Sequence, residues 1–194
     1  MFCIAAQLTI VFSTLVLASD VFIAAVFLIL ILSLCSRKVK AFREGIISRS
    51  SRYLKFLAFM VALVSTLGSL YYSEIAGYDP CRLCWFQRIM MYPLVILLGV
   101  SIWKKDRNVW NYVVPMSVIG SLIAVYHYYI QVAASKAASA CSSSGGVSCA
   151  SSPFFSYGYI TIPMMALTGF GLILIAFLGT FFAKKKEEKM RANR

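Results

Sequence analysis

Five long apolar stretches, separated by short polar or basic segments, dominate the hydrophobic pattern of this chain. Each stretch has the length that a helix needs to cross a membrane, roughly 20 residues. The third begins at Trp85 and ends at Trp103, and its 19 residues cover about 28 Å at about 1.5 Å each. The pattern therefore predicts five membrane-spanning helices, at about residues 14–35, 56–73, 85–103, 109–131 and 159–183.

The basic residues lie between these apolar stretches. The chain has 194 residues, is 60% hydrophobic and only 13% charged, and carries a formal net charge of +12. Sixteen of its 19 Lys and Arg residues fall within 36–55, 104–110 and 184–194. Because cytoplasmic loops of membrane proteins are enriched in Lys and Arg, this distribution predicts an outer N-terminus and a cytoplasmic C-terminus. The sequence has no basic stripe with interleaved aromatic residues, so we expect no nucleic-acid partner.

The predicted fold class is therefore an all-α integral membrane protein, a four-helix transmembrane bundle with one extra N-terminal transmembrane helix. We divide the chain into the extra helix, a basic cytoplasmic linker, the bundle and a basic cytoplasmic tail, at residues 1–35, 36–55, 56–183 and 184–194. The linker is either an ordinary solvated segment or an amphipathic helix at the membrane interface.

The extra helix carries one acidic residue and is flanked by two cysteines. We expect Asp20 to lie near the outer interface or to pair with a group on another helix, because an unpaired acidic residue within a span is costly. Cys3 and Cys35 would lie at opposite membrane faces, too far apart to form a disulfide. We therefore assign these two cysteines no role.

A Cys-x-x-Cys pair, Cys81 and Cys84, stands at the start of the third apolar stretch. Asp79 and Pro80 before it suit the N-cap and the first helical position. Cysteines in the first helical turn lie near unpaired amides and the positive end of the helix dipole, which stabilise a thiolate. Arg88 lies four residues after Cys84 and shares its helix face. The pattern predicts a redox-active pair; the alternative is a structural disulfide, with Arg88 reaching toward lipid headgroups.

A second cysteine pair, Cys141 and Cys149, lies in the segment 132–158, which is rich in Ser, Ala and Gly. Such a segment cannot build a core of its own. It suits a tether whose cysteines reach both a partner and the first pair, or a structural clip on a loop. All four cysteines are predicted on the oxidising side, where disulfides persist. His127 has the tyrosine neighbours of an interfacial residue, and we expect it at a depth similar to that of Arg88.

From about residue 53 to 183, the chain resembles the DsbB family of membrane disulfide oxidoreductases, particularly its compact BdbC-like members. The resemblance rests mainly on Cys81-Arg82-Leu83-Cys84-Trp85-Phe86-Gln87-Arg88-Ile89 and on Met91-Tyr92-Pro93. Further matches in order and spacing are Tyr126-His127-Tyr128, the pair Cys141 and Cys149, and Ile160-Thr161-Ile162-Pro163. The Cys-x-x-Cys pair precedes the loop cysteines, which is the reverse of the order in the vitamin K epoxide reductase family. The extra N-terminal helix departs from the four helices usual in the DsbB family.

The resemblance implies a quinone-dependent thiol:disulfide oxidoreductase in the bacterial cytoplasmic membrane, with its cysteines on the periplasmic or extracellular side. Its partners would be a DsbA-like thioredoxin-fold protein, the membrane lipid and a membrane quinone, either ubiquinone or menaquinone. Arg88 and His127 would form the quinone site, with Arg88 also holding the Cys84 thiolate. No metal is implied.

The resemblance also implies a role for each of the four outer cysteines. They would form two disulfides, Cys81–Cys84 and Cys141–Cys149. Cys141 would be attacked by the reduced partner, and Cys149 could form an interloop disulfide with Cys81. Cys84 would then be the thiolate that donates to the quinone.

Two other classes of protein compete with this interpretation. One is a membrane scaffold without enzymatic activity, whose two disulfides only brace the outer loops. The other is a metal-handling protein, because soft thiolate ligands bind Cu(I) or zinc. Against the latter, Arg88 would repel a cation, and the single histidine of the sequence provides no histidine cluster.

Overall fold

The computed structural model describes the backbone of residues 2–35, 37–106, 108–136, 149 and 156–192. The elements of this part are α1 (Phe2–Cys35), α2 (Arg37–Leu70), the π-helical turn η1 (Tyr71–Ile75), α3 (Arg82–Lys104), α4 (Trp110–Lys136) and α5 (Ile162–Ala192). The described residues include five helices long and apolar enough to cross a membrane, over Thr9–Val26, Tyr53–Ile75, Arg82–Lys104, Trp110–Ala133 and Ile162–Phe182. The predicted all-α membrane fold is therefore confirmed, and these stretches overlap all five predicted spans.

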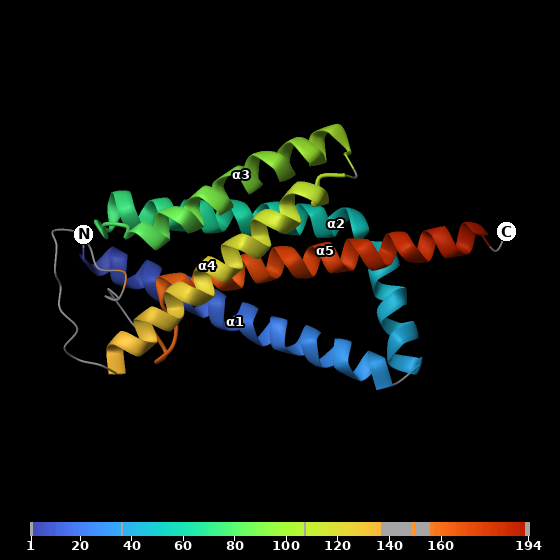
Figure 1. Cartoon of the computed structure of the whole chain (residues 1–194), viewed down its shortest axis with the longest axis horizontal. Coiled ribbons are helices and arrows are strands. Elements are labelled where there is room, and N and C mark those ends of the chain that lie inside the picture. Colours follow the sequence, from blue (N-terminus) through green and yellow to red (C-terminus); the bar gives the residue numbers. More distant parts are fainter. Residues whose placement is uncertain (1, 36, 107, 137–148, 150–155, 193–194) are drawn as a thin grey trace.

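Helices α2, α3, α4 and α5 form a four-helix bundle, and α1 lies beside it. In the bundle α5 packs against α2 and α4, and α3 packs against the same two helices from the other side. Helix α1 packs mainly against α2 and α5, and its Phe12 also contacts Tyr72 of η1. Helix α1 contacts the bundle through residues between Phe12 and Ile23, and Figure 1 shows it diverging from α5 toward its C-terminal end. The extra helix is thus attached at one end of the bundle.

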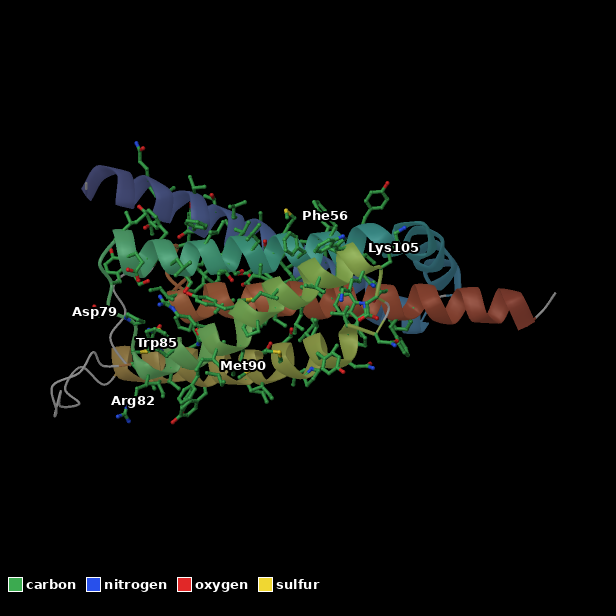
Figure 2. The ribbon with its side chains drawn as sticks, turned by 90° about the horizontal axis from the view of Figure 1, so that it is seen from above. Phe56, Asp79, Arg82, Trp85, Met90 and Lys105 are labelled. Atoms are coloured by element: carbon green, nitrogen blue, oxygen red, sulfur yellow. The ribbon has the colours of Figure 1, made fainter. Side chains whose placement is uncertain are left out.

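The two ends of the bundle differ in what they carry. The N-terminus, the start of α3, the end of α4 and the start of α5 lie together at one end, and the C-terminus lies at the other (Figure 1). Figure 2 shows Asp79, Arg82 and Trp85 at the first end, with Arg82 pointing away from the bundle, and Lys105 toward the second. At the second end the Lys55 ammonium donates to the Asp106 carbonyl, which ties α2 to the turn after α3.

The basic linker predicted at 36–55 is helical in its backbone from Arg37 onward. Its first turns run across the long axis of the bundle before α2 turns to follow that axis (Figure 1). The backbone is therefore helical here, and the position of this helix at a membrane interface stays a prediction.

The core of the bundle is apolar and closely packed. Leu94 and Leu98 of α3, Val113 of α4, and Phe170 and Ile173 of α5 have no exposed surface. Because the surrounding lipid is as apolar as these side chains, packing and close helix approach, rather than exclusion from water, hold such helices together. The fit of small residues against large ones therefore decides how well the bundle packs.

Gly120 of α4 provides the closest such fit. A Cβ atom at this position would lie 2.3 Å from Cζ of Phe170, a distance that real Cβ atoms do not reach. The ring of Phe170 is itself fully buried and cannot move aside easily. The missing side chain of Gly120 is therefore what lets α4 and α5 approach each other.

Asp20 attaches α1 to the start of α5. The Thr168 hydroxyl donates to Asp20 Oδ1 at 2.7 Å, and the Tyr159 hydroxyl donates to Asp20 Oδ2 at 3.3 Å. A carboxyl group at membrane depth is tolerated when both of its oxygens are hydrogen-bonded. Of the two alternatives for Asp20, pairing with another helix is therefore the one that the structure shows.

We predict that Gly120→Ala lowers the free energy of unfolding by about 1–3 kcal/mol, the usual range for overpacking a core. Gly171→Ala is the matched control in the neighbouring helix, because its Cβ would meet Ile23 of α1 at an ordinary 3.6 Å. Reversible unfolding in mixed detergent micelles measures both values. Equal free energies of unfolding for the two variants would contradict the packing described for Gly120.

Candidate active site

Helix α3 begins beside the first cysteine rather than before it. Cys81 is the N-cap, with an extended backbone at φ −69° and ψ 172°, and Arg82 is the first helical residue. The prediction of Asp79 as N-cap and Pro80 as first helical residue is therefore wrong by two positions. The reason is that the Cys81 thiol turns into the bundle, where it meets side chains of α3 and α4. Cys84 still lies in the first turn, as predicted.

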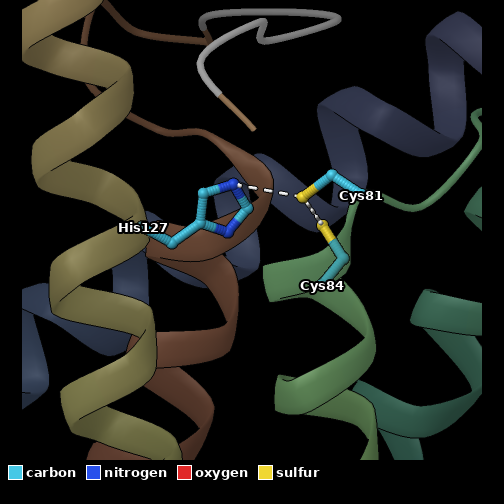
Figure 3. Close-up of side chains that lie close together, drawn as sticks. All are labelled: Cys81, Cys84 and His127. Carbon is cyan, nitrogen blue, oxygen red and sulfur yellow. Dashed lines mark hydrogen bonds between the residues drawn. The ribbon is translucent and has the colours of Figure 1, made fainter. Parts of the chain in front are cut away.

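Cys81, Cys84 and His127 lie together at the end of the bundle where α3 begins (Figure 3). The Cys81 thiol donates a hydrogen bond to Cys84 Sγ at 3.3 Å, and Cys81 Sγ lies 3.6 Å from His127 Nε2. Cys81 is 6% exposed and His127 is 1% exposed. The two cysteines form a reduced, hydrogen-bonded pair here, since the sulfur atoms of a disulfide are only about 2.05 Å apart. The Cys81–Cys84 disulfide stays a prediction.

The two ring nitrogens of His127 have different hydrogen-bond partners. Nε2 lies 3.1 Å from the Cys149 carbonyl oxygen, and Nδ1 lies 3.2 Å from Gln87 Nε2. A carbonyl oxygen can only accept, so His127 Nε2 carries the hydrogen and Nδ1 accepts from the Gln87 amide. His127 is thus a buried, hydrogen-bonded residue between the helices of the bundle, and its interfacial depth stays a prediction.

Cys149 connects the second cysteine pair to the first. Its thiol lies within hydrogen-bonding reach of the Cys81 thiol, in addition to the contact between its carbonyl and His127. The structure therefore brings together four predicted site residues, the three cysteines Cys81, Cys84 and Cys149 and the histidine His127. The predicted site residue Cys141 lies outside the described residues, and with it the predicted Cys141–Cys149 disulfide.

The surroundings of Cys81 and Cys149 favour their protonated forms. The hydrogen bond to Cys84, together with burial, raises the pKa of the Cys81 thiol to about 11. Burial also raises the pKa of Cys149. At neutral pH Cys81 therefore keeps its proton and shares it with Cys84, so Cys84 is the sulfur that accepts the hydrogen bond.

Arg88 lies one turn below Cys84 and is fixed against α2. Its Nη2 donates to the Ser69 carbonyl at 2.9 Å, and its Cζ lies 5.4 Å from the centre of the Trp85 ring. Tyr92, one turn further along α3, donates to the Ser69 hydroxyl at 3.3 Å. These contacts hold a cation near the Cys84 sulfur at membrane depth, which is uncommon without a functional reason.

A cavity of about 600 Å³ lies beside these residues. This volume falls within the roughly 300–1,000 Å³ of typical small-molecule sites. Most of its lining is apolar and comes from α1, α2 and α5. The polar or sulfur-bearing side chains of α3 and α4 that line it, with the N-cap cysteine, are Cys81, Cys84, Gln87, Arg88, Met91, Tyr92, His127 and Gln131. Such a cavity can hold a molecule with one polar part and one long apolar part.

Two site features were missed from the sequence. Gln87 is 5% exposed and orients His127, and its signal was a polar amide within an apolar span. The second is a set of ligand atoms, Cys81 Sγ, Cys84 Sγ and a ring nitrogen of His127, that lie within 4.8 Å of one another and could hold a metal ion. The signal for that set was absent, because His127 is far from the cysteines along the chain.

The fold and the site together define a membrane protein with a partly buried dithiol pair beside a mostly apolar cavity. The family model for disulfide bond formation protein DsbB matches residues 51–179, which is more than half of the chain. The chain therefore belongs to the DsbB family, whose members are membrane disulfide oxidoreductases. The predicted family is thus confirmed. The matched residues include Cys81, Cys84, Arg88 and His127, whereas α1 lies outside the match.

Individual relatives agree with this family. "Probable disulfide formation protein C 1" of Bacillus cereus is 44% identical over 140 residues, which are 71% of this chain and 97% of the relative. "Disulfide bond formation protein C" of Bacillus subtilis is 46% identical over 121 residues, 62% of this chain and 86% of the relative. "SPbeta prophage-derived disulfide bond formation protein B" of Bacillus subtilis is 42% identical over 140 residues, 71% of this chain and 93% of the relative. No solved structure matches the chain significantly.

We predict that alkylation of Cys81 in the reduced protein becomes about tenfold faster per pH unit between pH 7 and 10. The reason is that only the thiolate reacts, and a pKa of about 11 keeps the thiolate fraction small throughout this range. Trypsin cleaves after Arg82 and so separates the Cys81 peptide from the Cys84 peptide for mass spectrometry. Cys84→Ala removes the hydrogen-bond acceptor and should speed alkylation of Cys81 at neutral pH. A rate that levels off by pH 9 in the native protein would contradict this pKa.

Proposed function

We propose that this protein reoxidises the dithiol of a DsbA-like, thioredoxin-fold partner and passes the two electrons to a membrane quinone. The observation that carries the proposal is the cavity, which is lined both by Cys84 and Arg88 and by apolar side chains of three spans. Family membership supplies the thiol chemistry, and the cavity supplies a place for an acceptor that dissolves in the membrane.

The route from the partner follows the order in which the sulfur atoms lie. A thiolate of the partner attacks the Cys141–Cys149 disulfide and releases Cys149. Cys149 attacks Cys81 in the Cys81–Cys84 disulfide, which forms a Cys81–Cys149 bond and releases Cys84 as a thiolate. Each exchange forms one sulfur–sulfur bond and breaks one. The contact between the Cys149 and Cys81 thiols, and the 3.3 Å between Cys81 and Cys84, support this order.

The residues around the cavity fit a quinone. The guanidinium of Arg88 has more N–H donors than its contact with Ser69 uses, and quinone oxygens are hydrogen-bond acceptors. The apolar lining from α1, α2 and α5 suits an apolar chain. A bound quinone would supply an acceptor for two electrons and two protons. Arg88 would favour the thiolate of Cys84 next to it, and the surrounding spans would exclude water.

The orientation of the bundle across the membrane can be inferred from the distribution of basic residues. We propose that the cysteine end of the bundle faces the periplasmic or extracellular side of a bacterial cytoplasmic membrane. The C-terminal end of α5 lies at the opposite end, and the sequence beyond the span there is rich in Lys (Figure 1). Placing that end in the cytoplasm agrees with the enrichment of basic residues in cytoplasmic segments.

Metal handling is a second candidate function, favoured by the grouping of Cys81, Cys84 and His127. Thiolates and imidazole bind zinc and Cu(I) readily. Against it, His127 Nε2 donates to the Cys149 carbonyl instead of offering a lone pair, and Arg88 lies one turn from Cys84. Metal analysis of the reduced protein after equilibration with zinc separates the two functions, because metal handling requires about one bound ion per chain.

We predict that Cys84→Ser abolishes quinone reduction by the purified protein with a reduced thioredoxin-fold dithiol protein as donor. A serine hydroxyl cannot form a disulfide, so Cys149 finds no Cys81–Cys84 bond to attack and the electrons stop at the Cys141–Cys149 pair. Absorbance of the quinone measures turnover, and Cys3→Ser is the control in a cysteine to which no role is assigned. A scaffold would instead show no turnover in the native protein, with both disulfides intact whatever the quinone.

We predict that Arg88→Ala raises the KM for quinone about 10- to 100-fold, as expected when a hydrogen bond to a charged group is lost. The KM for the dithiol donor should stay unchanged, because Arg88 lies on the cavity side of Cys84. Lys104→Ala is the matched control, since it removes an exposed positive charge from the other end of α3. Equal effects of the two substitutions on the KM for quinone would argue against a role for Arg88.

A further inference from the structure

Helix α1 lies outside the family match and yet lines the same cavity as Cys84 and Arg88. Its contribution comes from one face of the span, the side chains of Phe12, Leu15, Val16 and Ser19. The matched part of the chain, residues 51–179, therefore does not complete the cavity without a helix that precedes it.

Specific contacts hold α1 at the cavity. Asp20, one residue after the lining Ser19, accepts the hydrogen bonds from Thr168 and Tyr159 described above. Phe12 lies against Tyr72 of η1, with ring centroids 6.0 Å apart. A Cβ on Gly68 of α2 would come within 3.3 Å of the Phe12 ring, so the glycine leaves room for this ring. Helix α1 is therefore packed against the bundle where the cavity lies and diverges from it further on (Figure 1).

The cavity differs in character from one set of walls to the other. Its thiol, guanidinium and imidazole groups come from α3, α4 and the N-cap of α3, whereas α1, α2 and α5 supply mostly apolar side chains. A membrane quinone has the same division, with a polar ring and a long apolar chain. If the quinone ring lies beside Cys84 and Arg88, the apolar tail of the quinone contacts the apolar walls of the cavity.

We propose that α1 forms the wall that receives the apolar chain of the acceptor, and that it makes the site select acceptors by that chain. The inference rests on the proposed function. Val16 is one of the α1 residues that form this wall, and Asp20 is the positioning residue that keeps α1 in place. The selection of quinones by the length of their apolar tail then depends on a helix that lies outside the family match.

The first test compares two valines of α1. Val16 lines the cavity, whereas Val21 is 65% exposed and does not line it. In the full-length protein in lipid nanodiscs, Val16→Trp should raise the KM for a quinone with a long apolar tail about tenfold, because the indole occupies the space that the tail would fill. The same variant should raise the KM for the same ring with a short apolar tail much less, so that the ratio of the two KM values increases. Val21→Trp should change none of these values.

The second test measures binding without turnover. A quinone with a photoreactive group at the end of its chain is bound to the full native chain and activated by light. The first Lys or Arg of the sequence is Arg37, so trypsin releases α1 within residues 1–37. We expect label in that peptide, competed by unlabelled quinone and reduced by Val16→Trp. Label confined to peptides of α2–α5, or label in 1–37 that quinone does not compete, would overturn the inference.

The position of Asp20 is tested by a pair of substitutions. Asp20→Leu removes both hydrogen-bond acceptors and should raise the KM for the long-chain quinone, whereas Asp20→Asn keeps an acceptor for Thr168 and should largely restore it. Native turnover with equal KM values for Val16→Trp and Val21→Trp would leave the proposed function standing and overturn this inference alone. A native chain that reduces no quinone would overturn both.

Discussion

The hydrogen-bonded contact of Cys81 with Cys84, and the approach of His127 to Cys81, hold together the end of the bundle at which α3 begins. The contact fixes where α3 begins, because the Cys81 thiol must turn inward to reach α4. It also brings in Cys149, whose carbonyl accepts from His127. A buried polar cluster is stable only when its members satisfy one another, so the start of α3, the end of α4 and the loop at Cys149 depend on each other.

The second requirement is space beside this cluster within a closely packed bundle. Core residues such as Leu94 and Phe170 fill the centre completely, and glycines such as Gly120 allow the helices to approach. The cavity lies where α1 packs against the bundle. The Ser69 carbonyl accepts a hydrogen bond from Arg88 and holds it at the cavity wall. The Cys81–Cys84 dithiol faces both the loop at Cys149 and the apolar cavity. It can therefore exchange disulfides with a protein on one side and pass electrons to a membrane-dissolved acceptor on the other.

Much of this arrangement could be predicted from the sequence. The five spans follow from the bilayer thickness, which imposes a length and an apolar composition on each helix. The shared face of Cys84 and Arg88 follows from their spacing of four residues. The approach of His127 to Cys81 and the pairing of Asp20 with Thr168 could not be predicted, because both join helices far apart in the chain. Periodicity gives no orientation when almost every face of a helix is apolar.

The central claim is that electrons pass from Cys149 to Cys81 and then leave through Cys84. The most direct measurement is disulfide mapping of the native protein after reduced partner is added without quinone. This account predicts a disulfide between Cys81 and Cys149, which trypsin isolates because it cleaves between Cys81 and Cys84 at Arg82, and which disappears when quinone is added. A Cys81–Cys84 disulfide that persists unchanged while the partner stays reduced would contradict it.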